Sequence, residues 1–164
     1  MRGLALVVVL LIAWVQPATA DEWTQFKLSD TWSGDYGTAA KVSGIVDDRH
    51  GTRAAVLVVS CANNRTSVFM SADYLVFGGD IVRVEYVVDA GPRQRAYWSV
   101  CAGDLCAGLW NGLGIPFVHA LLDASVLKMT LTRHFGGPIY ATFPVHGARE
   151  ALMEVARQCN WKQP

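Results

Sequence analysis

The chain has 164 residues, of which 52% are hydrophobic, and its 14 basic and 14 acidic side chains give a net charge of zero. A chain of this length forms one domain and can bury a substantial core. Because no run of basic residues occurs, the sequence argues against nucleic acid as a partner. No linker, low-complexity segment or internal repeat divides it.

The first 20 residues have the layout of a secretory signal peptide. The short basic start Met1-Arg2-Gly3 precedes the uncharged apolar run Leu4–Val15, and Ala18-Thr19-Ala20 supplies a cleavage motif. The apolar run of about 12 residues is too short for a bilayer, which needs roughly 20. The sequence predicts cleavage after Ala20 and export, periplasmic or secreted. It predicts a single β-rich domain over residues 21–164, with no transmembrane segment after cleavage.

Strands are expected through most of the following chain. Residues 23–29 and 38–43 are short candidates, and the β-branched run Ala54–Cys61 is too short for most helices. The pair Asn63-Asn64 predicts a two-residue turn into a strand over 66–71.

The run Ile81–Val88 predicts a strand with one buried face, because apolar and polar residues alternate along it. Its outward residues include Arg83 and Glu85. Its expected inward side chains are Val82, Val84, Tyr86 and Val88. Two later strands, over 127–133 and 139–143, flank the turn signal Phe135–Pro138.

Two segments have helical features. Pro116 stands at the first position of an expected short helix over 116–125. The segment 148–159 carries one apolar stripe at helical spacing. The residues of this stripe are Ala151, Leu152, Val155, Ala156 and Cys159. Together the elements predict a mainly β (α+β) fold. We expect an antiparallel β sandwich or curled sheet with two helices, the C-terminal one packed on the sheet, and disulfide staples.

The cysteines support this expectation, because an even number in an exported chain favours disulfides. Cys101 and Cys106 flank Gly103-Asp104, a hairpin turn signal. With that turn the two cysteines face each other, about 4.5–5.5 Å apart, within reach of a disulfide. A cross-strand disulfide is favoured, and free thiols and metal ligation are the alternatives. Tyr97 and Trp110 lie on the same face as these cysteines, which makes them candidates to contact a partner.

The remaining pair, Cys61 and Cys159, would tie the terminal helix to the sheet. The closed loop would be nearly a hundred residues long, for which chain entropy predicts a stabilisation of about 4–5 kcal/mol.

Catalytic signatures are missing from the sequence. It contains no Gly-x-Ser-x-Gly elbow, no His-Glu-x-x-His pair and no phosphate-binding glycine loop. The pair Asp47-Asp48 and His50 are expected to be solvated in a loop or turn, and His119 is expected to be a satisfied core residue. The four histidines are not expected to share a metal ion. We therefore predict no catalytic residue, no metal site and no cofactor.

Several motifs carry a family resemblance over residues 57–161. They include a strand ending in Cys61 followed by Asn63 or Asn64 and Thr66, and a Val-x-Tyr-x-Val-Asp strand before a Gly-Pro pair. They also include Tyr97-Trp98-Ser99, the segment 141–152 and the ending Cys159-Asn-Trp161. Together these motifs resemble the type VI secretion-associated VasI (TagO) family of exported accessory proteins. The Cys101/Cys106 hairpin departs from that pattern and is similar to the invasion-associated locus B family, which is also exported.

Both resemblances imply a non-enzymatic protein of the cell envelope, and neither supplies catalytic residues. The first implies an accessory or binding protein of a type VI secretion or similar envelope system, with an envelope or secretion-system protein as its partner. The alternatives are a virulence or stress protein like those of the second family, or an inhibitor of an exported hydrolase. An enzyme with an unrecognised site is the competing class.

Overall fold

The computed structural model describes residues 23–30 and 34–162 of the chain. The expected signal peptide and its cleavage site lie outside these residues. The described strands are β1 (Thr24–Asp30), β2 (Gly34–Asp48), β3 (Gly51–Ala62), β4 (Arg65–Ala72), β5 (Ile81–Val88), β6 (Gln94–Val100), β7 (Cys106–Leu109), β8 (Val126–Thr132) and β9 (Pro138–Pro144). The described helices are α1 (Ile115–Leu121), α2 (Ala148–Ala151) and α3 (Met153–Gln158). None of the helices in this part of the chain is long and apolar enough to cross a membrane.

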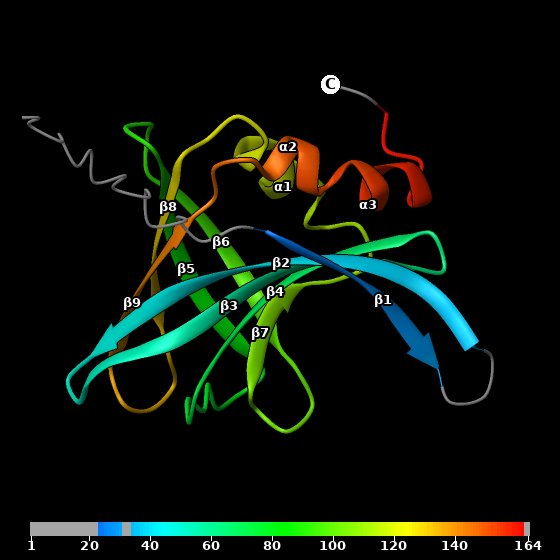
Figure 1. The fold of residues 1–164 in the computed structure, drawn as a ribbon. Helices are drawn as coiled ribbons and strands as arrows, with labels where there is room; N and C mark the ends of the chain where they lie inside the picture. Colours follow the sequence, from blue (N-terminus) through cyan, green and yellow to red (C-terminus); the bar gives the residue numbers. More distant parts are fainter. Residues whose placement is uncertain (1–22, 31–33, 163–164) are drawn as a thin grey trace, which may run out of the picture.

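The strands form a closed antiparallel barrel (Figure 1). They pair in the order β1-β2-β3-β4-β7-β6-β5-β8-β9, and β2 pairs in addition with β9. The mainly β content is as expected. The expected sandwich is wrong, because the eight strands β2–β9 belong to one sheet that closes on itself, and β1 is an extra strand on β2.

Closure depends on β2, which serves two neighbours along one edge. Its first half pairs with β1, and Ile45–Asp47 near its end pair with Tyr140–Thr142 of β9. Between these two regions lies Gly44. A Cβ atom at this position would overlap the ring of Phe143 and the carbonyl oxygen of Thr142. The glycine therefore permits the close approach of β2 to β9.

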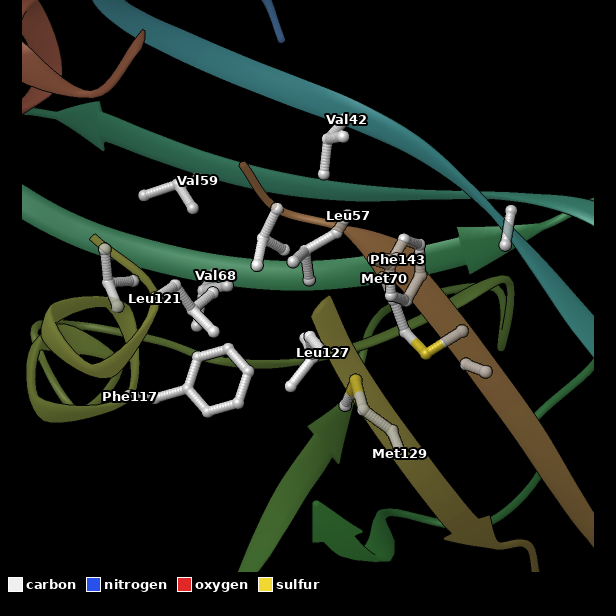
Figure 2. Close-up of a cluster of buried hydrophobic side chains, with 14 of the residues drawn as sticks. Val42, Leu57, Val59, Val68, Met70, Phe117, Leu121, Leu127, Met129 and Phe143 are labelled. Atoms are coloured by element: carbon white, nitrogen blue, oxygen red, sulfur yellow. The ribbon is translucent and has the colours of Figure 1, made fainter. Parts of the chain in front are cut away.

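Apolar side chains fill the barrel (Figure 2). An eight-stranded barrel has an interior just wide enough for this. The largest fully buried side chains include Leu57, Met70, Leu127, Leu131, Ile139 and Phe143. From α1, Phe117 packs edge-on against Trp98 and Tyr86, with ring centroids 5.4 Å and 4.9 Å apart. Helix α1 therefore plugs one end of the barrel, which we call the helix end.

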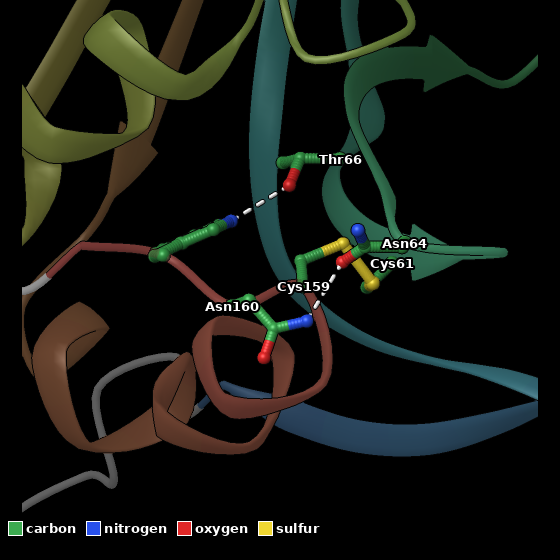
Figure 3. Close-up of a disulfide and its surroundings, with 6 residues drawn as sticks. Cys61, Asn64, Thr66, Cys159 and Asn160 are labelled. Carbon is green, nitrogen blue, oxygen red and sulfur yellow. Dashed lines mark hydrogen bonds between the residues drawn. A yellow bond between two sulfur atoms is a disulfide. The ribbon is translucent and has the colours of Figure 1, made fainter.

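The C-terminal segment is fastened to the helix end (Figure 3). Cys61 and Cys159 form the expected disulfide, with Cα atoms 5.7 Å apart. Beside it, Asn160 Nδ2 donates a hydrogen bond to Asn64 Oδ1 at 3.0 Å. The disulfide thus joins the end of β3 to the residue that follows α3.

The single helix expected over 148–159 is two short helices in the structure. Leu152, with φ −96° and ψ 0°, leaves the helical conformation between α2 and α3. The expected apolar stripe still faces the barrel, because Leu152 and Val155 are fully buried. After α3, Trp161 Nε1 donates a hydrogen bond of 2.7 Å to the buried Thr66 Oγ1.

The hairpin between β6 and β7 has the expected register. Val100 is paired with Ala107, and Cys101 N–H donates to the Cys106 carbonyl oxygen at 2.9 Å. The two cysteines form the second disulfide, with Cα atoms 5.3 Å apart. No described cysteine is free, so the thiol and metal alternatives do not apply.

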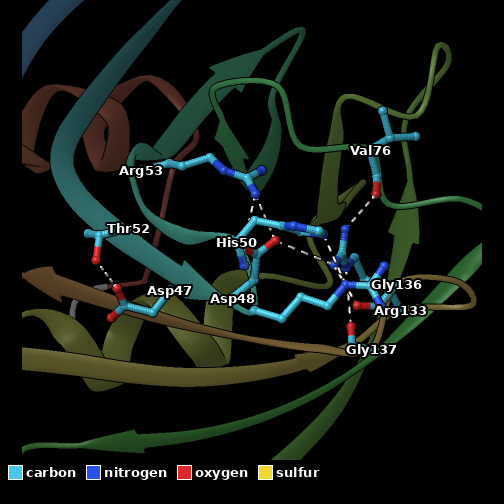
Figure 4. A network of polar contacts seen from close by, with 10 residues as sticks. Asp47, Asp48, His50, Thr52, Arg53, Val76, Arg133, Gly136 and Gly137 are labelled. Atoms are coloured by element: carbon cyan, nitrogen blue, oxygen red, sulfur yellow. Dashed lines mark hydrogen bonds and ion pairs between the residues drawn. The ribbon is translucent and has the colours of Figure 1, made fainter.

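The opposite end of the barrel holds an ion cluster around Asp48 (Figure 4). Arg53 Nη2 contacts both oxygens of the Asp48 carboxylate at 2.9 and 3.0 Å, and His50 N–H donates to it at 2.8 Å. The side chain of Asp48 is only 2% exposed. The expectation that Asp48 is solvated is therefore wrong, whereas His50 is exposed in the turn. The His50 amide lowers the pKa of Asp48 below its usual range; burial opposes this and the nearby cations add to it.

Arg133 extends this cluster to two further loops. Its guanidinium lies 3.8 Å from Asp48 and is 9% exposed. It donates hydrogen bonds to the carbonyl oxygens of Val76, Gly136 and Gly137 at 3.2–3.3 Å. One arginine therefore holds the β2–β3 turn, the loop after β4 and the β8–β9 turn together.

Removing the long-range disulfide should destabilise the protein more than removing the hairpin disulfide. Chain entropy predicts about 4–5 kcal/mol for the Cys61–Cys159 loop and about 2 kcal/mol for the short loop. Urea unfolding of C61S/C159S and C101S/C106S double variants measures both losses. An equal loss would mean that residual structure in the unfolded chain already restrains the long loop.

Gly44→Ala should destabilise the protein by about 3 kcal/mol, because the new methyl group overpacks the seam between β2 and β9. The neighbouring Ser43 is exposed, so Ser43→Ala should change stability by less than about 0.5 kcal/mol. Thermal unfolding measures both variants. An unchanged Tm for Gly44→Ala would contradict the role given to this glycine.

Asp48→Asn should lower Tm at pH 7, because the buried Arg133 loses its counter-ion. The pKa of Asp48 is lowered in the folded protein. The ionised carboxylate therefore contributes to folding stability above its ordinary pKa of about 3.9, and this contribution is lost as the pH falls below that value. The Tm difference from the wild type should therefore shrink below about pH 4. Asp47→Asn is the control, with a smaller effect at pH 7. A difference independent of pH would contradict an electrostatic role.

Candidate functional site

The outer surface of β5, β6 and β8 gathers basic side chains that are far apart in the sequence. We call Arg83, Arg93, Arg95 and Lys128 the basic face. Cross-strand pairing brings Arg83, Arg95 and Lys128 onto one surface, because β5 lies between β6 and β8, and Arg93 directly precedes β6. Glu85 is the one carboxylate among the outward residues of the described strands β5, β6, β8 and β9.

Two of these arginines share Glu85. Arg93 and Arg95 contact its carboxylate at 3.1 and 3.2 Å. Burial raises the pKa of Glu85, but the hydrogen bonds and charges of Arg95 and Arg93 outweigh it, and the net pKa is lowered. Glu85 therefore stays ionised and neutralises one positive charge of the face.

The other two cations have no carboxylate within ion-pair distance in the described ranges. Arg83 is exposed and lies 3.5 Å from the hydroxyl of Thr132. Lys128 is exposed on β8 and lines a groove of about 350 Å³ together with Arg93, Glu85 and Asp89. The face thus keeps an excess of positive charge that could receive acidic side chains.

Tyr97, one of the two candidate partner-facing residues, lies on this surface. It is 65% exposed on β6, and its cross-strand partner is Arg83. Tyrosine and arginine are both enriched in the centres of protein interfaces. The exposed Tyr97 ring therefore lies on the strand next to Arg83, whose guanidinium reaches to Thr132 on β8.

Trp110, the other candidate, is less available. It is half-buried after β7 and stacks on Phe69 of β4, with ring centroids 5.5 Å apart. Gly108 lies beneath this pair, where a Cβ atom would overlap Phe69. Trp110 therefore contributes to packing of the outer surface, and Tyr97 is the more accessible ring.

A larger hollow of about 880 Å³ lies at the helix end. Leu122, Leu152 and Trp161 supply apolar surface to it. Its arginines are already neutralised, since Arg149 pairs with Asp123 at 2.6 Å and Arg157 pairs with Glu154 at the same distance. The large hollow and the smaller groove are each lined by two cations and two carboxylates, so neither lining has a net charge.

The histidines do not form a site with other ligating groups. No three His, Cys, Asp or Glu side chains converge in the described part of the chain. His119 is half-buried with its ring edge-on to Trp161 at 5.6 Å, but its Nε2 has no hydrogen-bond partner. The expectation that the ring nitrogens of His119 are all hydrogen-bonded is therefore wrong.

Comparison with known proteins adds no family assignment. No family model, no curated protein and no solved structure matches this chain. The likeness to the two exported families accordingly rests on sequence motifs alone.

Proposed function

We propose that this is an exported, non-enzymatic accessory protein of the cell envelope that binds an acidic surface of a partner protein through its basic face. The observation that supports this most is the neighbourhood of the exposed Tyr97 and Arg83. An exposed aromatic ring beside an arginine without a carboxylate partner is typical of a residue pair that becomes buried on binding.

The compartment in this proposal is supported by the cysteines. The described cysteines pair at bonding distance in two disulfides, and such bonds persist in oxidising compartments. The periplasm, and a place beside a type VI secretion or similar envelope system, remain parts of the proposal that the sequence resemblance supports. The motifs shared with the VasI (TagO) family favour such a partner over a soluble small molecule.

The basic face would act in two stages. Its excess positive charge would raise the rate of encounter with an acidic partner, an effect that salt screens. Tyr97 would then be buried in contact with the partner, and Arg83 would gain the carboxylate it lacks. Arg93 and Arg95, which already share Glu85, would contribute less.

Tyr97→Glu and Arg83→Glu should each reduce capture of the partner from an envelope extract by about tenfold or more. Both side chains are exposed, so the circular dichroism spectrum and Tm should stay close to the wild type. Capture should also weaken as salt is raised from 50 to 500 mM, in proportion to screening of the face.

Met153→Glu is the matched control, because Met153 is as exposed as Tyr97 but lies on α3 at the helix end. It should leave capture unchanged. Full capture by both Tyr97→Glu and Arg83→Glu would contradict the proposed face. A hydrolytic activity abolished by one carboxylate or histidine substitution would contradict the non-enzymatic assignment.

A further inference from the structure

Four segments meet at the end of the barrel opposite the helices (Figure 1). We call this the loop end; it consists of residues 49–50, 73–80, 101–105 and 133–137. Backbone contacts join these segments, since Phe77 N–H donates to the Asp104 carbonyl oxygen at 2.9 Å. Arg133 links the last segment to Val76 at 3.2 Å. The loop end is therefore one connected surface.

Large apolar side chains are concentrated on this surface. Among the exposed ones are Tyr74 at 96%, Val76 at 53%, Ile81 at 60%, Leu105 at 57% and Phe135 at 72%. They come from three different segments and the start of β5. Apolar patches rimmed by polar groups on exported proteins are typical of docking surfaces.

Tyr74 is held in an unfavourable backbone conformation. Its φ of 56° lies in the left-handed region, which bulky residues rarely adopt. The flanking residue Leu75 is fully buried, and Asp73 N–H donates to the Ala54 carbonyl oxygen at 3.1 Å. The anchored neighbours thus project an almost fully exposed ring. The turn at Tyr74 thus accompanies the burial of Leu75 and leaves the tyrosine ring available to a partner.

The same surface carries unneutralised negative charge. Asp73 and Asp80 are exposed and Asp104 is half-buried, and none has an ion-pair partner among the described residues. Nearby, Arg53 and Arg133 share the one carboxylate of Asp48, and Arg49 donates to His50 at 2.9 Å without a carboxylate partner among the described residues. Counting Asp48 with the three free carboxylates, four aspartates face three arginines, and the loop end has a net charge of −1. This net charge is opposite in sign to that of the basic face.

We propose that the loop end is a second docking surface, which binds a polypeptide segment containing apolar and cationic side chains. The exposed rings and aliphatic groups would receive the apolar side chains, and the three carboxylates would pair with lysine or arginine. An anionic bilayer would be repelled by the same carboxylates. A symmetric pair of loop ends would bring like charges together. The proposal does not rest on the basic face, which lies on the barrel wall.

Three 12-residue synthetic peptides test this proposal on the ¹⁵N-labelled mature protein. One combines leucine with lysine, one leucine with glutamate, and one serine with lysine. The leucine–lysine peptide should shift the amide signals of residues 73–80, 101–105 and 133–137. The other two should bind at least tenfold more weakly, since each lacks one of the two complementary features.

Variants assign the binding to this surface. Phe135→Ser and Asp80→Asn should each weaken binding of the leucine–lysine peptide at least fivefold. Leu113→Ser is the matched control, because Leu113 is as exposed as Phe135 but follows β7 at the helix end. Tyr74→Asn should weaken binding while leaving Tm equal or higher, because asparagine tolerates a positive φ. Tyr97→Glu should leave peptide binding intact, which separates this surface from the proposed basic face.

Four results would overturn the proposal. The loop-end signals could stay unmoved by the leucine–lysine peptide, or move equally with the leucine–glutamate peptide. Binding to phosphatidylglycerol vesicles that Phe135→Ser abolishes would assign the surface to a membrane instead. Self-association in sedimentation experiments that Phe135→Ser abolishes would assign it to a second copy of the chain.

Discussion

The whole arrangement depends on β2 having two different neighbours along the same edge. Because β1 occupies the first half of this edge, only Ile45–Asp47 remain to meet β9 and close the barrel. Closure removes sheet edges and encloses the apolar interior. It also positions the next residue, Asp48, whose contacts with Arg133 hold the loops beyond the seam. A seam of a few residue pairs thus fixes both the core and the loop end.

The two ends of the barrel have different physical characters. The helix end is closed by an aromatic plug, a disulfide and the hydrogen bond from Trp161 to Thr66, and its stripe of apolar side chains is buried. The loop end holds more exposed apolar groups than the helix end, and one of them, Tyr74, is a bulky residue with positive φ, whereas the non-glycine residues with positive φ at the helix end are asparagine or aspartate. The contacts at the helix end stabilise the folded chain. The protein can therefore tolerate exposed apolar groups at the loop end, which lower its stability, as functional surfaces commonly do.

Local signals in the sequence predicted local structure well. The register of the β6–β7 hairpin, its disulfide and the alternation of β5 were evident from spacing and turn residues, and the Cys61–Cys159 pairing followed because these were the two remaining cysteines. Closure of the barrel could not be predicted from the sequence. It depends on the pairing of Ile45 with Thr142, which are far apart in the chain, and the apolar and polar alternation of their strands would suit an open sheet equally well. The basic face was hidden for the same reason, since Arg83, Arg95 and Lys128 come onto one surface only through the pairing of β5 with β6 and β8. The outward position of Arg83 was predictable.

The Cys101–Cys106 disulfide lies within the loop that the Cys61–Cys159 disulfide closes, and this nesting favours one order of disulfide formation. As the chain emerges from its N-terminus, Cys61 is available long before Cys159, and Cys101 is the first cysteine it meets. Pairing of consecutive cysteines would therefore give the wrong bond. The loop between Cys101 and Cys106 is so short that its closure is far more probable than closure of the longer one. Early oxidation of the hairpin would thus remove Cys101 as a competing partner for Cys61. Cys61 would then stay free to pair with Cys159 once the C-terminal residues have been synthesised.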